Sequence, residues 1–358
     1  MRILFLEPFH GGSHREFVTG LQEYSRHAID VETLPARLWK WRLRTAGLTL
    51  AQRVSNPERF NLVVATGLLD LAQVRAVWGA RTPPLLLYLH ESQISYPVPT
   101  GRSANVEFLW KDVINVLTAD HVVFTSEFHR RTFRAQLPSV IDQLPDTDHI
   151  PVVPLSRIDR NSSVLYPGCR FDDVKPEVSP NDLPTVIWNH RWEFDKNPKE
   201  FVNALVQVAS RGVQFKVALL GERLIPEPEA LVHARAELGD RIIYDGFPPR
   251  SVYLRYLAGG SLVVSSAVQE NFGIAVMEAM YAGCMPLLPR RLVYPEIIPS
   301  DLHKRCLYDS PDDLVDRLSQ ELQMSQIEKD RWKKIAEPHA WSRVIDNYDS
   351  LFEAIAFA

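Results

Sequence analysis

Residues 265–283 read SSAVQENFGIAVMEAMYAG, which joins the end of an apolar run to a glycine turn and an alanine-rich segment. The run at 261–265 predicts a strand, the segment at 273–282 predicts a helix, and Glu270 falls in the loop between them. Glu278 follows after seven further residues, inside the expected helix. Gly273 lets the backbone approach a ligand closely, and the N–H groups at a helix start suit a diphosphate. The stretch therefore predicts an α/β unit with a ligand loop; a capped helix with solvated glutamates is the alternative.

A second polar stretch, WNHRWEFDKNP at 188–198, follows an expected strand at 185–188. It falls at the carboxyl edge of the sheet, where doubly wound folds bind their ligands. Arg191 and Lys196 are five residues apart across a turn. Two fixed cations can neutralise a departing nucleotide diphosphate in place of a metal ion. The alternative is a surface pairing with Glu193 and Asp195.

Two shorter motifs occupy equivalent positions in the first half of the chain. EPFHGGSH at 7–14 places Gly11 and Gly12 before a helix start, without the full dinucleotide or P-loop spacing. A tight turn explains it equally well. HESQISYP at 90–97 lies just past a strand end, where His90 can hydrogen-bond a sugar or steady a developing charge. A structural histidine is the alternative there.

Alternation of apolar runs and amphipathic stretches predicts the rest of the fold. Expected strands are 3–6, 61–66, 85–90, 121–125, 185–188, 216–220, 242–244, 261–265 and 285–288. Expected helices are 13–26, 68–78, 105–119, 198–209, 227–238, 249–258 and 273–282, with an amphipathic segment at 339–358. The proline-rich and aspartate-rich residues near 171–184 indicate a linker between two α/β halves.

Length and composition agree with this organisation. The 358 residues predict two domains, and 46% hydrophobic with 23% charged residues excludes a disordered tail, a fibrous repeat and a coiled coil. We expect no transmembrane helix, and the first apolar run breaks at Glu7, too early for a signal peptide. Three scattered cysteines, Cys169, Cys284 and Cys306, predict neither a disulfide framework nor a zinc cluster. A reducing, cytoplasmic setting is the default expectation.

The net charge of −4 argues against a nucleic-acid partner, but the charge is uneven. Residues 1–170 carry a net +3 and the remainder −7. The segment 37–53 holds five cations, no acid and two interleaved tryptophans: Arg37, Lys40, Arg42, Arg44, Arg53, Trp39 and Trp41. Cations suit phosphates, and aromatic faces suit unstacked bases of an RNA loop. Alternatively, one tryptophan belongs to the core and the arginines form surface pairs.

The order of these motifs resembles that of the retaining, family-4-type glycosyltransferases of the GT-B fold. Arg191/Lys196 match that family's Arg-x4-Lys pair, and Glu270/Glu278 match its Glu-x7-Glu motif. The resemblance implies two Rossmann-like domains facing across a cleft, at 1–172 and 185–338. It further implies a linker at 173–184 and a C-terminal helix, 339–358, crossing back to the first domain.

Motifs of the first half narrow the resemblance to the tRNA-queuosine α-mannosyltransferase family. They are FHGGSH at 9–14, LPARLWKWRLRT at 34–45 and YLHESQISYP at 88–97, and NHRWE at 189–193 fits the same family. This resemblance implies a retaining transfer of mannose from GDP-mannose to queuosine in the anticodon loop of tRNA-Asp. No Asp-x-Asp lies near the motifs, which fits catalysis without a metal or other cofactor. Stable membrane association is not expected.

The resemblance also implies roles for individual residues. Expected catalytic residues are His90, Arg191, Lys196 and Glu270. Expected donor-binding residues are Gly11, Gly12, Asn189, Gly221, Gly246, Phe247, Asn271, Phe272, Gly273, Ile274 and Glu278, of which Glu278 would hold the ribose. Expected contacts with the acceptor tRNA are His14, Arg37, Trp39, Lys40, Trp41, Arg42, Arg44, Glu91, Gln93 and Tyr96.

Two other functions fit the same residues. One is a family-4-type glycosyltransferase that uses another nucleotide sugar and a small or lipid acceptor. The other is a non-catalytic RNA-binding protein on a GT-B shell, which the paired cations and glutamates disfavour.

Overall fold

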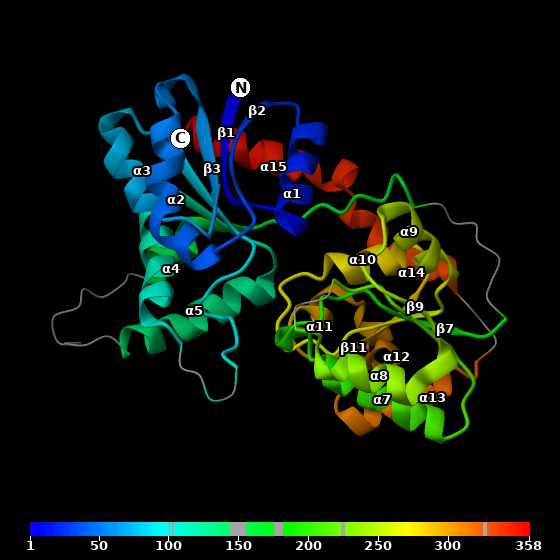
Figure 1. The fold of residues 1–358 in the computed structure, drawn as a ribbon. Helices are drawn as coiled ribbons and strands as arrows, with labels where there is room; N and C mark the ends of the chain where they lie inside the picture. Colours follow the sequence, from blue (N-terminus) through cyan, green and yellow to red (C-terminus); the bar gives the residue numbers. More distant parts are fainter. Residues whose placement is uncertain (100, 102–103, 144–154, 175–181, 223–225, 325–327) are drawn as a thin grey trace. The chain divides into compact units, whose positions relative to one another are not determined.

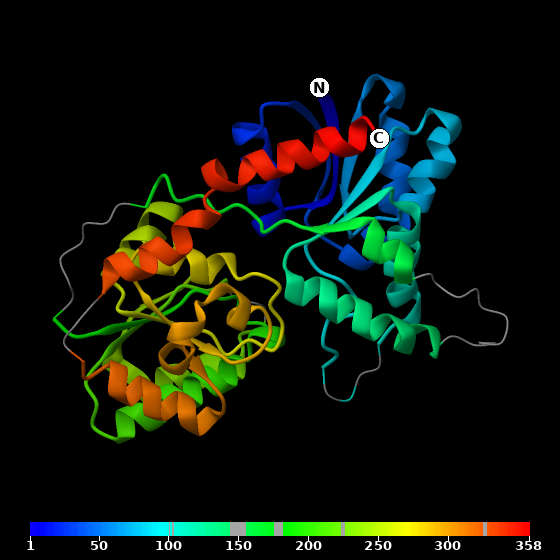
Figure 2. The same cartoon turned by 180° about the vertical axis from the view of Figure 1, so that it is seen from behind.

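The computed structural model describes residues 1–99, 101, 104–143, 155–174, 182–222, 226–324 and 328–358. Two compact units form the chain, and Figures 1 and 2 show them from opposite sides. Unit 1 comprises Met1–Gly168 together with Trp341–Ala358, and unit 2 comprises Cys169–Ala340. Each unit is an α/β sandwich around a parallel six-stranded sheet, so the expected fold class is confirmed.

The sheet of unit 1 has the strand order β2-β1-β3-β4-β5-β6. Its strands are β1 (Arg2–His10), β2 (Ala28–Pro35), β3 (Leu62–Thr66), β4 (Leu85–Leu89), β5 (His121–Phe124) and β6 (Ser162–Val164). Every residue of β3 and β4 is buried, as continuous apolar runs in a doubly covered parallel sheet require. The strand order reverses between β1 and β3, which makes the carboxyl ends of these strands the expected ligand edge.

Two apolar layers cover the faces of this sheet. One contains side chains from α2 (Trp39–Arg53), α3 (Leu71–Trp78), α4 (Val106–Thr118), α5 (Glu127–Ile141) and α6 (Leu155–Arg160). The other contains side chains from α1 (Gly12–Tyr24) and α15 (Trp341–Ala356). Trp341, Tyr348 and Phe352 of α15 pack beside Phe17 of α1 in that layer, and the red helix α15 lies along unit 1 in both views (Figures 1 and 2).

The sheet of unit 2 has the order β12-β11-β10-β7-β8-β9. Its strands are β7 (Thr185–Trp188), β8 (Lys216–Leu219), β9 (Ile242–Asp245), β10 (Leu262–Val264), β11 (Met285–Pro289) and β12 (Leu307–Tyr308). Counted from β7, this is the 3-2-1-4-5-6 order of dinucleotide-binding domains, with its reversal between β7 and β10. The loops after β7 and β10 carry the two strongest sequence motifs.

Helices flank this second sheet, and short 3-10 turns occur in both units. The helices are α7 (Pro198–Ser210), α8 (Glu229–Leu238), α9 (Arg250–Gly259), α10 (Ile274–Tyr281), α11 (Tyr294–Ile297), α12 (His303–Cys306), α13 (Pro311–Glu321) and α14 (Lys329–Ala336). The 3-10 turns are η1 (Pro57–Arg59), η2 (Gly79–Arg81), η4 (Phe194–Lys196), η5 (Gly239–Arg241), η6 (Ser300–Leu302) and η7 (Glu337–His339). A buried cluster joins α7, α8 and α13 to the strands.

The change of unit after Gly168 comes a few residues before the expected domain end at 172. Cys169, Phe171 and Val174 are buried in unit 2, where Phe171 stacks on Tyr281 with ring centroids 4.1 Å apart. Burial of these apolar side chains makes the start of the expected linker part of the second core. Residues 175–181 of that linker lie outside the described residues.

Among the described helices, none combines the length and the apolar composition that crossing a bilayer requires.

Candidate active site

Hydrogen bonds join the loops after β7 and β10 at the reversal point of the unit 2 sheet. The backbone N–H groups of Val268 and Gln269 donate to the Asp195 carbonyl at 2.8 and 3.2 Å. Ser266 Oγ lies 2.9 Å from the carbonyl oxygens of both Lys196 and Asn197. The two motifs, about seventy residues apart in sequence, therefore form one site.

Lys196 and Glu270 form an ion pair at the centre of this site. Lys196 Nζ lies 3.2 Å from Glu270 Oε2, 3.2 Å from Asp195 Oδ2 and 2.9 Å from the Gln269 carbonyl. Burial disfavours both charges, but mutual attraction outweighs it, so the pKa of Lys196 is raised and the pKa of Glu270 is lowered. Both groups are consequently charged at neutral pH.

Arg191 differs from Lys196 in its surroundings. Its side chain is 53% exposed and lies 3.3 Å from Glu193 Oε2. The neighbouring His190 is buried, and burial followed by repulsion from Lys196 lowers the pKa of His190 to about 4. A neutral imidazole therefore directly precedes Arg191 in the chain.

Glu278 lies in α10, where two side chains of α9 contact its carboxylate. Tyr253 donates its hydroxyl to Glu278 Oε2 at 2.9 Å, and Arg250 bonds to Oε1. Arg250 also bonds to Asp173 at 2.9 and 3.0 Å, and Asn189 Nδ2 donates to the Tyr253 hydroxyl at 3.1 Å. Burial outweighs the arginine and raises the pKa of Glu278. The expected ribose ligand is thus held by Arg250 and Tyr253, for which the sequence had suggested no role.

The expected donor residues on the other loops of unit 2 lie in different environments. Gly273 has φ +92° at the start of α10, and Asn271 and Phe272 beside it are buried. The Phe272 ring packs against His339 with centroids 5.1 Å apart, while Ile274 is half-buried. A Cβ at Gly221 would overlap the His190 carbonyl oxygen, so the loop after β8 supports the loop after β7.

Gly246 and Phe247 follow β9 at the same edge of the sheet. The Gly246 N–H donates to the Leu219 carbonyl at 2.9 Å, which ties the end of β9 to the end of β8. Phe247 is 71% exposed, so its ring is a surface group.

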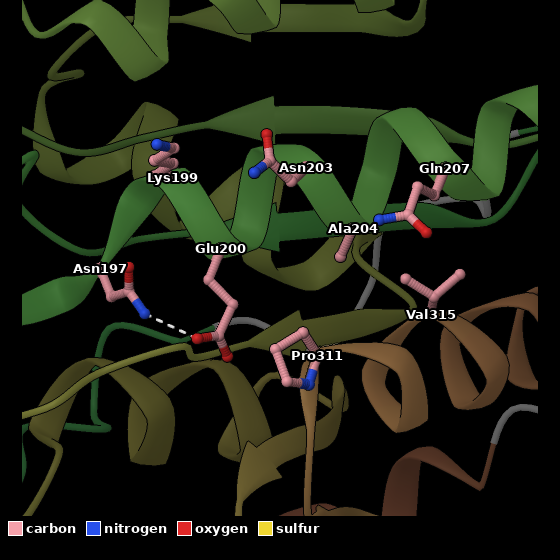
Figure 3. A pocket seen from close by; sticks show the side chains of 8 residues that line it. All are labelled: Asn197, Lys199, Glu200, Asn203, Ala204, Gln207, Pro311 and Val315. Atoms are coloured by element: carbon pink, nitrogen blue, oxygen red, sulfur yellow. Dashed lines mark hydrogen bonds between the residues drawn. The ribbon is translucent and has the colours of Figure 1, made fainter.

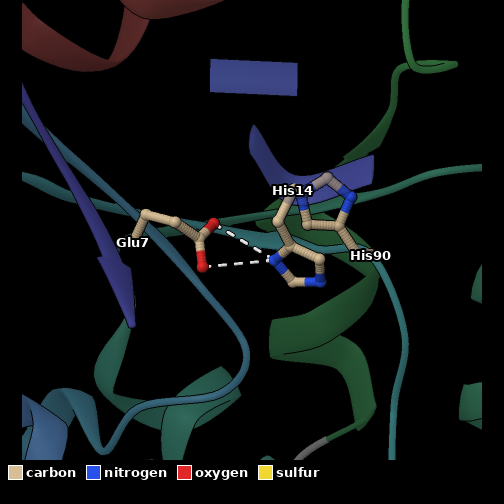
Figure 4. A group of neighbouring side chains, drawn as sticks. All are labelled: Glu7, His14 and His90. Atoms are coloured by element: carbon tan, nitrogen blue, oxygen red, sulfur yellow. Dashed lines mark hydrogen bonds and ion pairs between the residues drawn. The ribbon is translucent and has the colours of Figure 1, made fainter. Parts of the chain in front are cut away.

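In unit 1, Glu7, His14 and His90 form a group at the β1/β3 edge. Glu7 is fully buried, and His14 Nδ1 lies 3.2 and 3.1 Å from its two carboxylate oxygens. The rings of His14 and His90 lie 4.3 Å apart (Figure 4). Burial, then His14, lowers the pKa of His90 well below its usual value, so His90 is neutral. Potential ligand atoms of the three residues lie within 4.8 Å of one another, as a cation would require.

The turn and the loop beside this group hold further predicted residues. Gly12 has φ +51°, and a Cβ at Gly11 would overlap that of Ala36. The loop after His90 is anchored by Asp112 of α4, whose Oδ2 accepts from Ser92 Oγ at 2.7 Å and from the Gln93 N–H at 2.6 Å. Burial raises the pKa of Asp112 to about 7. Glu91, Gln93 and Tyr96 are half-buried in this loop.

Comparison with known proteins identifies the family. Residues 2–169 match the model described as tRNA-queuosine alpha-mannosyltransferase N-terminal, and residues 170–338 match glycosyl transferases group 1. A Drosophila melanogaster protein named tRNA-queuosine alpha-mannosyltransferase is 35% identical over 335 residues, which are 88% of this chain and 85% of that protein. The chain belongs to the tRNA-queuosine α-mannosyltransferase family.

Solved structures resemble this family member in fold. Sucrose-phosphate synthase from Thermosynechococcus elongatus superposes with a TM-score of 0.77 at 14% identity, covering 99% of each chain. Anabaena HepE, in complex with UDP and glucose, gives 0.70 at 15% identity, covering 99% of this chain and 100% of its own. At such identities the likeness shows the GT-B fold alone, which confirms the fold expected from the motifs.

In this family member, the basic, tryptophan-containing segment forms α2 from Trp39 onward, and Arg37 lies just before the helix. Trp41 is 57% exposed, whereas Trp39 is half-buried and packs against Phe108 at 5.5 Å between ring centroids. Arg44 pairs with Glu107 at 3.0 Å. Arg42 donates to the Pro35 carbonyl at 3.1 Å and Arg53 to the Thr33 carbonyl at 3.0 Å.

Arg37 and Lys40 are exposed and, within the part of the chain that the structure describes, have no carboxylate at ion-pair distance. Trp41, Arg37 and Lys40 therefore fit the expected basic aromatic surface. Trp39 and Arg44 fit the alternative, in which one tryptophan belongs to the core and the arginines form surface pairs.

A groove of about 270 Å³ elsewhere in unit 2 lies between α7 and α13 (Figure 3). Its lining consists of Asn197, Lys199, Glu200, Asn203, Ala204, Gln207, Pro311 and Val315. Glu200 there accepts from Asn197 Nδ2 at 2.7 Å and from the Tyr308 hydroxyl at 3.0 Å, so its carboxylate is engaged within the protein. None of the predicted site residues lines this groove.

Proposed function

We propose that this chain transfers mannose from GDP-mannose to queuosine in the anticodon loop of tRNA-Asp, with retention of the α configuration. The relative from Drosophila melanogaster, whose name includes this acceptor and an α-mannosyl product, carries the proposal, since similarity extends over 88% of the chain. The Lys196–Glu270 pair at the reversal point of unit 2 supports it chemically. We further propose that the protein acts in the cytoplasm, without stable membrane association.

In this proposal unit 2 binds the donor. Arg191 and Lys196 neutralise the diphosphate, because charged donors fixed in advance stabilise a leaving group without reorganising. Glu270 and the N–H groups at the start of α10 hold the sugar hydroxyls, and Glu278 accepts from the ribose while Arg250 holds its other oxygen. Asn189, Gly221, Gly246 and Phe247 line the nucleotide side. No metal or other cofactor is needed, since the two cations supply the positive charge.

Unit 1 handles the acceptor in this proposal. His90 hydrogen-bonds the transferred mannose, and Gly11 and Gly12 allow the first turn of α1 to approach the phosphates or the acceptor. Exposed groups of α2 and the loop with Glu91, Gln93 and Tyr96 contact the tRNA. Trp41 offers a stacking face for an unstacked base, and Arg37 and Lys40 offer charge to phosphates.

The proposed transfer occurs on one face of the sugar. The bond from the anomeric carbon to the diphosphate oxygen breaks, and its electron pair leaves with GDP. A hydroxyl oxygen of queuosine forms the new bond to the same carbon, and its proton goes to the departing diphosphate. Front-face departure and attack yield the α product without a covalent enzyme intermediate.

A direct assay tests the donor, the acceptor and the stereochemistry separately. The protein is incubated with GDP-mannose and queuosine-containing tRNA-Asp, and the released nucleosides are examined for a hexose mass increment. Matched controls are the same tRNA with guanine in place of queuosine, and GDP-glucose or UDP-glucose as donor. An α-mannosidase that releases the added hexose supports retention, and unchanged rates after chelation of metal ions support metal independence.

Three results would contradict the proposal. Transfer to a lipid or a small glycoside in place of tRNA would identify the rival glycosyltransferase. Transfer only from another nucleotide sugar would overturn the donor. Binding of tRNA without binding of any nucleotide sugar by calorimetry would indicate an RNA-binding protein on a GT-B shell.

A further inference from the structure

The side-chain amide of Asn189 links the loop after β7 to the two helices around Glu278. Its Nδ2 lies 2.7 Å from the Ala275 carbonyl in the first turn of α10 and 3.1 Å from the Tyr253 hydroxyl of α9. Since a carbonyl oxygen only accepts hydrogen bonds, the amide atom that faces Ala275 must be the nitrogen. The orientation of the amide is therefore fixed, and the same nitrogen donates to Tyr253.

This orientation determines where the proton of the Tyr253 hydroxyl goes. A phenolic hydroxyl has one proton to donate, and it can accept a hydrogen bond at the same time. Because Asn189 Nδ2 can only donate, the Tyr253 oxygen accepts from it, and the hydroxyl proton is directed at Glu278 Oε2, 2.9 Å away. Hydrogen bonds thus run in one direction, from Asn189 through Tyr253 to Glu278, and the members of such a chain polarise one another.

The Glu278 carboxylate is the end of this chain, and it retains capacity for a ligand. Tyr253 donates to Oε2 and Arg250 to Oε1, and among the described residues these are its two hydrogen-bond donors. An ionised carboxylate has about four lone-pair sites and no proton to donate, so about two sites remain for further donors. The side chain is 12% exposed, so part of it can be reached from solvent.

A carboxylate held in this way selects its ligand by chemistry. It attracts hydroxyl groups and repels phosphates, because it only accepts hydrogen bonds and is negatively charged. Two neighbouring hydroxyls, as on a ribose, can donate to both of its oxygens. A sugar that lacks these hydroxyls leaves the carboxylate without its ligand partners, which a site built for hydrogen bonding disfavours strongly.

We propose that Tyr253 is a positioning and specificity-determining residue of the donor site, which holds Glu278 so that the site selects a nucleotide with a ribose diol over one without it. Asn189 acts through Tyr253, and neither side chain has to touch the ribose. The inference rests on the proposed function, because it extends the proposed contact between Glu278 and the donor ribose. It adds the group that orients the carboxylate and the selection that follows.

Calorimetry with GDP and with 2′,3′-dideoxy-GDP tests the proposal, because the analogue lacks both ribose hydroxyls. We expect the wild type to prefer GDP at least about tenfold, the scale of a hydrogen bond to a charged group. In Tyr253→Phe the affinity for GDP should fall about tenfold while the affinity for the analogue stays unchanged, so the preference shrinks. A merely structural role of Tyr253 would weaken both ligands alike and leave the preference unchanged, which contradicts the proposal.

Tyr256→Phe is the matched control, because it removes a hydroxyl from the same helix. The Tyr256 ring packs on Tyr244 with centroids 4.8 Å apart, and the proposal assigns it no role. This variant should bind GDP and the analogue as the wild type does. A loss of preference in Tyr256→Phe as large as that in Tyr253→Phe would show that any change in α9 has the effect, and would overturn the proposal.

A double variant tests whether Tyr253 acts through Glu278. Glu278→Ala should by itself remove most of the preference for GDP. Adding Tyr253→Phe to Glu278→Ala should then change the affinity for GDP less than about twofold, because residues that act through one another are not additive. A full additional tenfold loss would show that Tyr253 acts independently of Glu278, and would overturn the proposal.

The outcomes separate this inference from the function on which it rests. Absence of mannosyl transfer by the wild-type protein overturns the proposed function. Wild-type transfer with equal affinities for GDP and the dideoxy analogue, or with an unchanged preference in Tyr253→Phe, overturns only the inference about Tyr253. If Tyr253→Phe loses its thermal transition, Asn189→Ala replaces it. The preference should shrink in that variant too, and an unchanged preference contradicts the proposal.

Discussion

Lys196 is a buried cation whose charge two carboxylates balance, whereas Arg191 is largely exposed beside one glutamate. Removing Lys196 leaves Asp195 and Glu270 facing each other without a counter-charge. Removing Arg191 disturbs little of the folded protein. The two cations, which are five residues apart in sequence, are therefore separable by experiment.

We expect Arg191→Ala to lower kcat about 10²- to 10³-fold, the size for one fixed donor at a developing charge. Its melting temperature should match that of the wild type. Lys196→Met should lose activity and also about 1–3 kcal/mol of unfolding free energy, because buried charged acceptors lose their donor. Steady-state kinetics and denaturant titration measure both effects, and near-wild-type turnover in both variants would contradict the diphosphate roles.

Glu278 shows that the spacing of a motif does not determine which side chains surround its residues. The seven-residue interval correctly placed Glu270 in a loop and Glu278 in a helix. The interval could not indicate that Arg250 contacts Glu278. That contact requires α9 to lie beside α10, which depends on the order of β9, β10 and β7 in the sheet. Glu7 is a charged residue at the end of an apolar run, which is an unusual position for an acid, but no role was predicted for it from the sequence.

At the scale of elements, the loops after β7, β8 and β10 pack against one another and depend on one another for their positions. Gly221 is the residue on which their approach depends, because an added Cβ would meet the His190 backbone. A backbone oxygen, unlike a flexible side chain, cannot move without shifting the strand end that carries Arg191.

We therefore expect Gly221→Ala to weaken binding of the nucleotide sugar at least about tenfold and to lower the melting temperature, since overpacking typically costs about 1–3 kcal/mol. Val232→Ala is the control, because Val232 is an exposed residue of α8 to which the proposal assigns no role, so it should bind GDP-mannose as the wild type does. Calorimetry with GDP-mannose measures the difference. Equal affinities in the two variants would show that the loop tolerates the displacement.

The two tryptophans of helix α2 lie in different environments, because Trp41 is exposed and Trp39 is half-buried. Their substitution should therefore affect different properties, tRNA binding for Trp41 and stability for Trp39. Trp41→Ala should weaken tRNA binding by about 1–3 kcal/mol, the value for one base stacked on an aromatic ring, with unchanged stability. Trp39→Ala should mainly lower stability, because Trp39 packs on Phe108. Fluorescence anisotropy with labelled tRNA and thermal melting distinguish the two outcomes, and a Trp41→Ala variant with full tRNA affinity would remove α2 from the interface.

The exposed charges of Lys40 in α2 and of Arg37 just before this helix add a salt dependence that can be measured separately. Arg37→Ala and Lys40→Ala should each reduce the slope of log affinity against log salt by about 1, because each phosphate contact releases counterions. Arg134→Ala, which removes an arginine paired with Asp159 at 2.8 Å, is the control expected to leave the slope unchanged. Equal slopes in all variants would contradict a phosphate role for Arg37 and Lys40.

Helices and strands that contain a strong apolar run could be predicted from the sequence, whereas elements that lack such a run could not. β3, β4, β7 and β8 coincide with expected strands because every residue of the first three, and every residue of β8 after Lys216, is buried. β2, α2 and α5 were absent from the expected elements. β2 is an edge strand with only one fully buried position, so it lacks the continuous apolar run of the central strands. The alternation of Ile29 and Val31 with Asp30 and Glu32 is its one strand signal.

At the scale of the whole molecule, both units bury histidines that must be neutral. Burial lowers the pKa of His129 to about 3 and of His190 and His339 to about 4, and it lowers that of His90 well below its usual value. An unfolded histidine titrates near 6.5, so below that pH the unfolded chain binds more protons than the folded one. The stability that the folded protein gains from keeping these histidines neutral is complete above about pH 6.5 and is lost as the pH falls.

As the pH falls from 6.5 toward 4, we expect each of these histidines to lower the free energy of unfolding by about 1.4 kcal/mol per pH unit. Asp112 acts in the opposite sense, because its raised pKa stabilises the fold below about pH 4 and this gain is lost toward pH 7. Urea titrations at several pH values, comparing wild type with His129→Gln, isolate one histidine. An identical pH slope in both proteins would show that His129 is not kept neutral by burial.

The sequence alone determined the class of fold and the family, because apolar runs, loop glycines and motif order are local properties of the chain. The chain also determined which residue types were available at each strand end. Tertiary structure decided which of them meet: Lys196 with Glu270, Glu278 with Arg250, His14 with His90, and Trp39 rather than Trp41 with the core. Those pairs depend on strand order and helix packing, which bring together residues far apart in sequence and which no local spacing encodes.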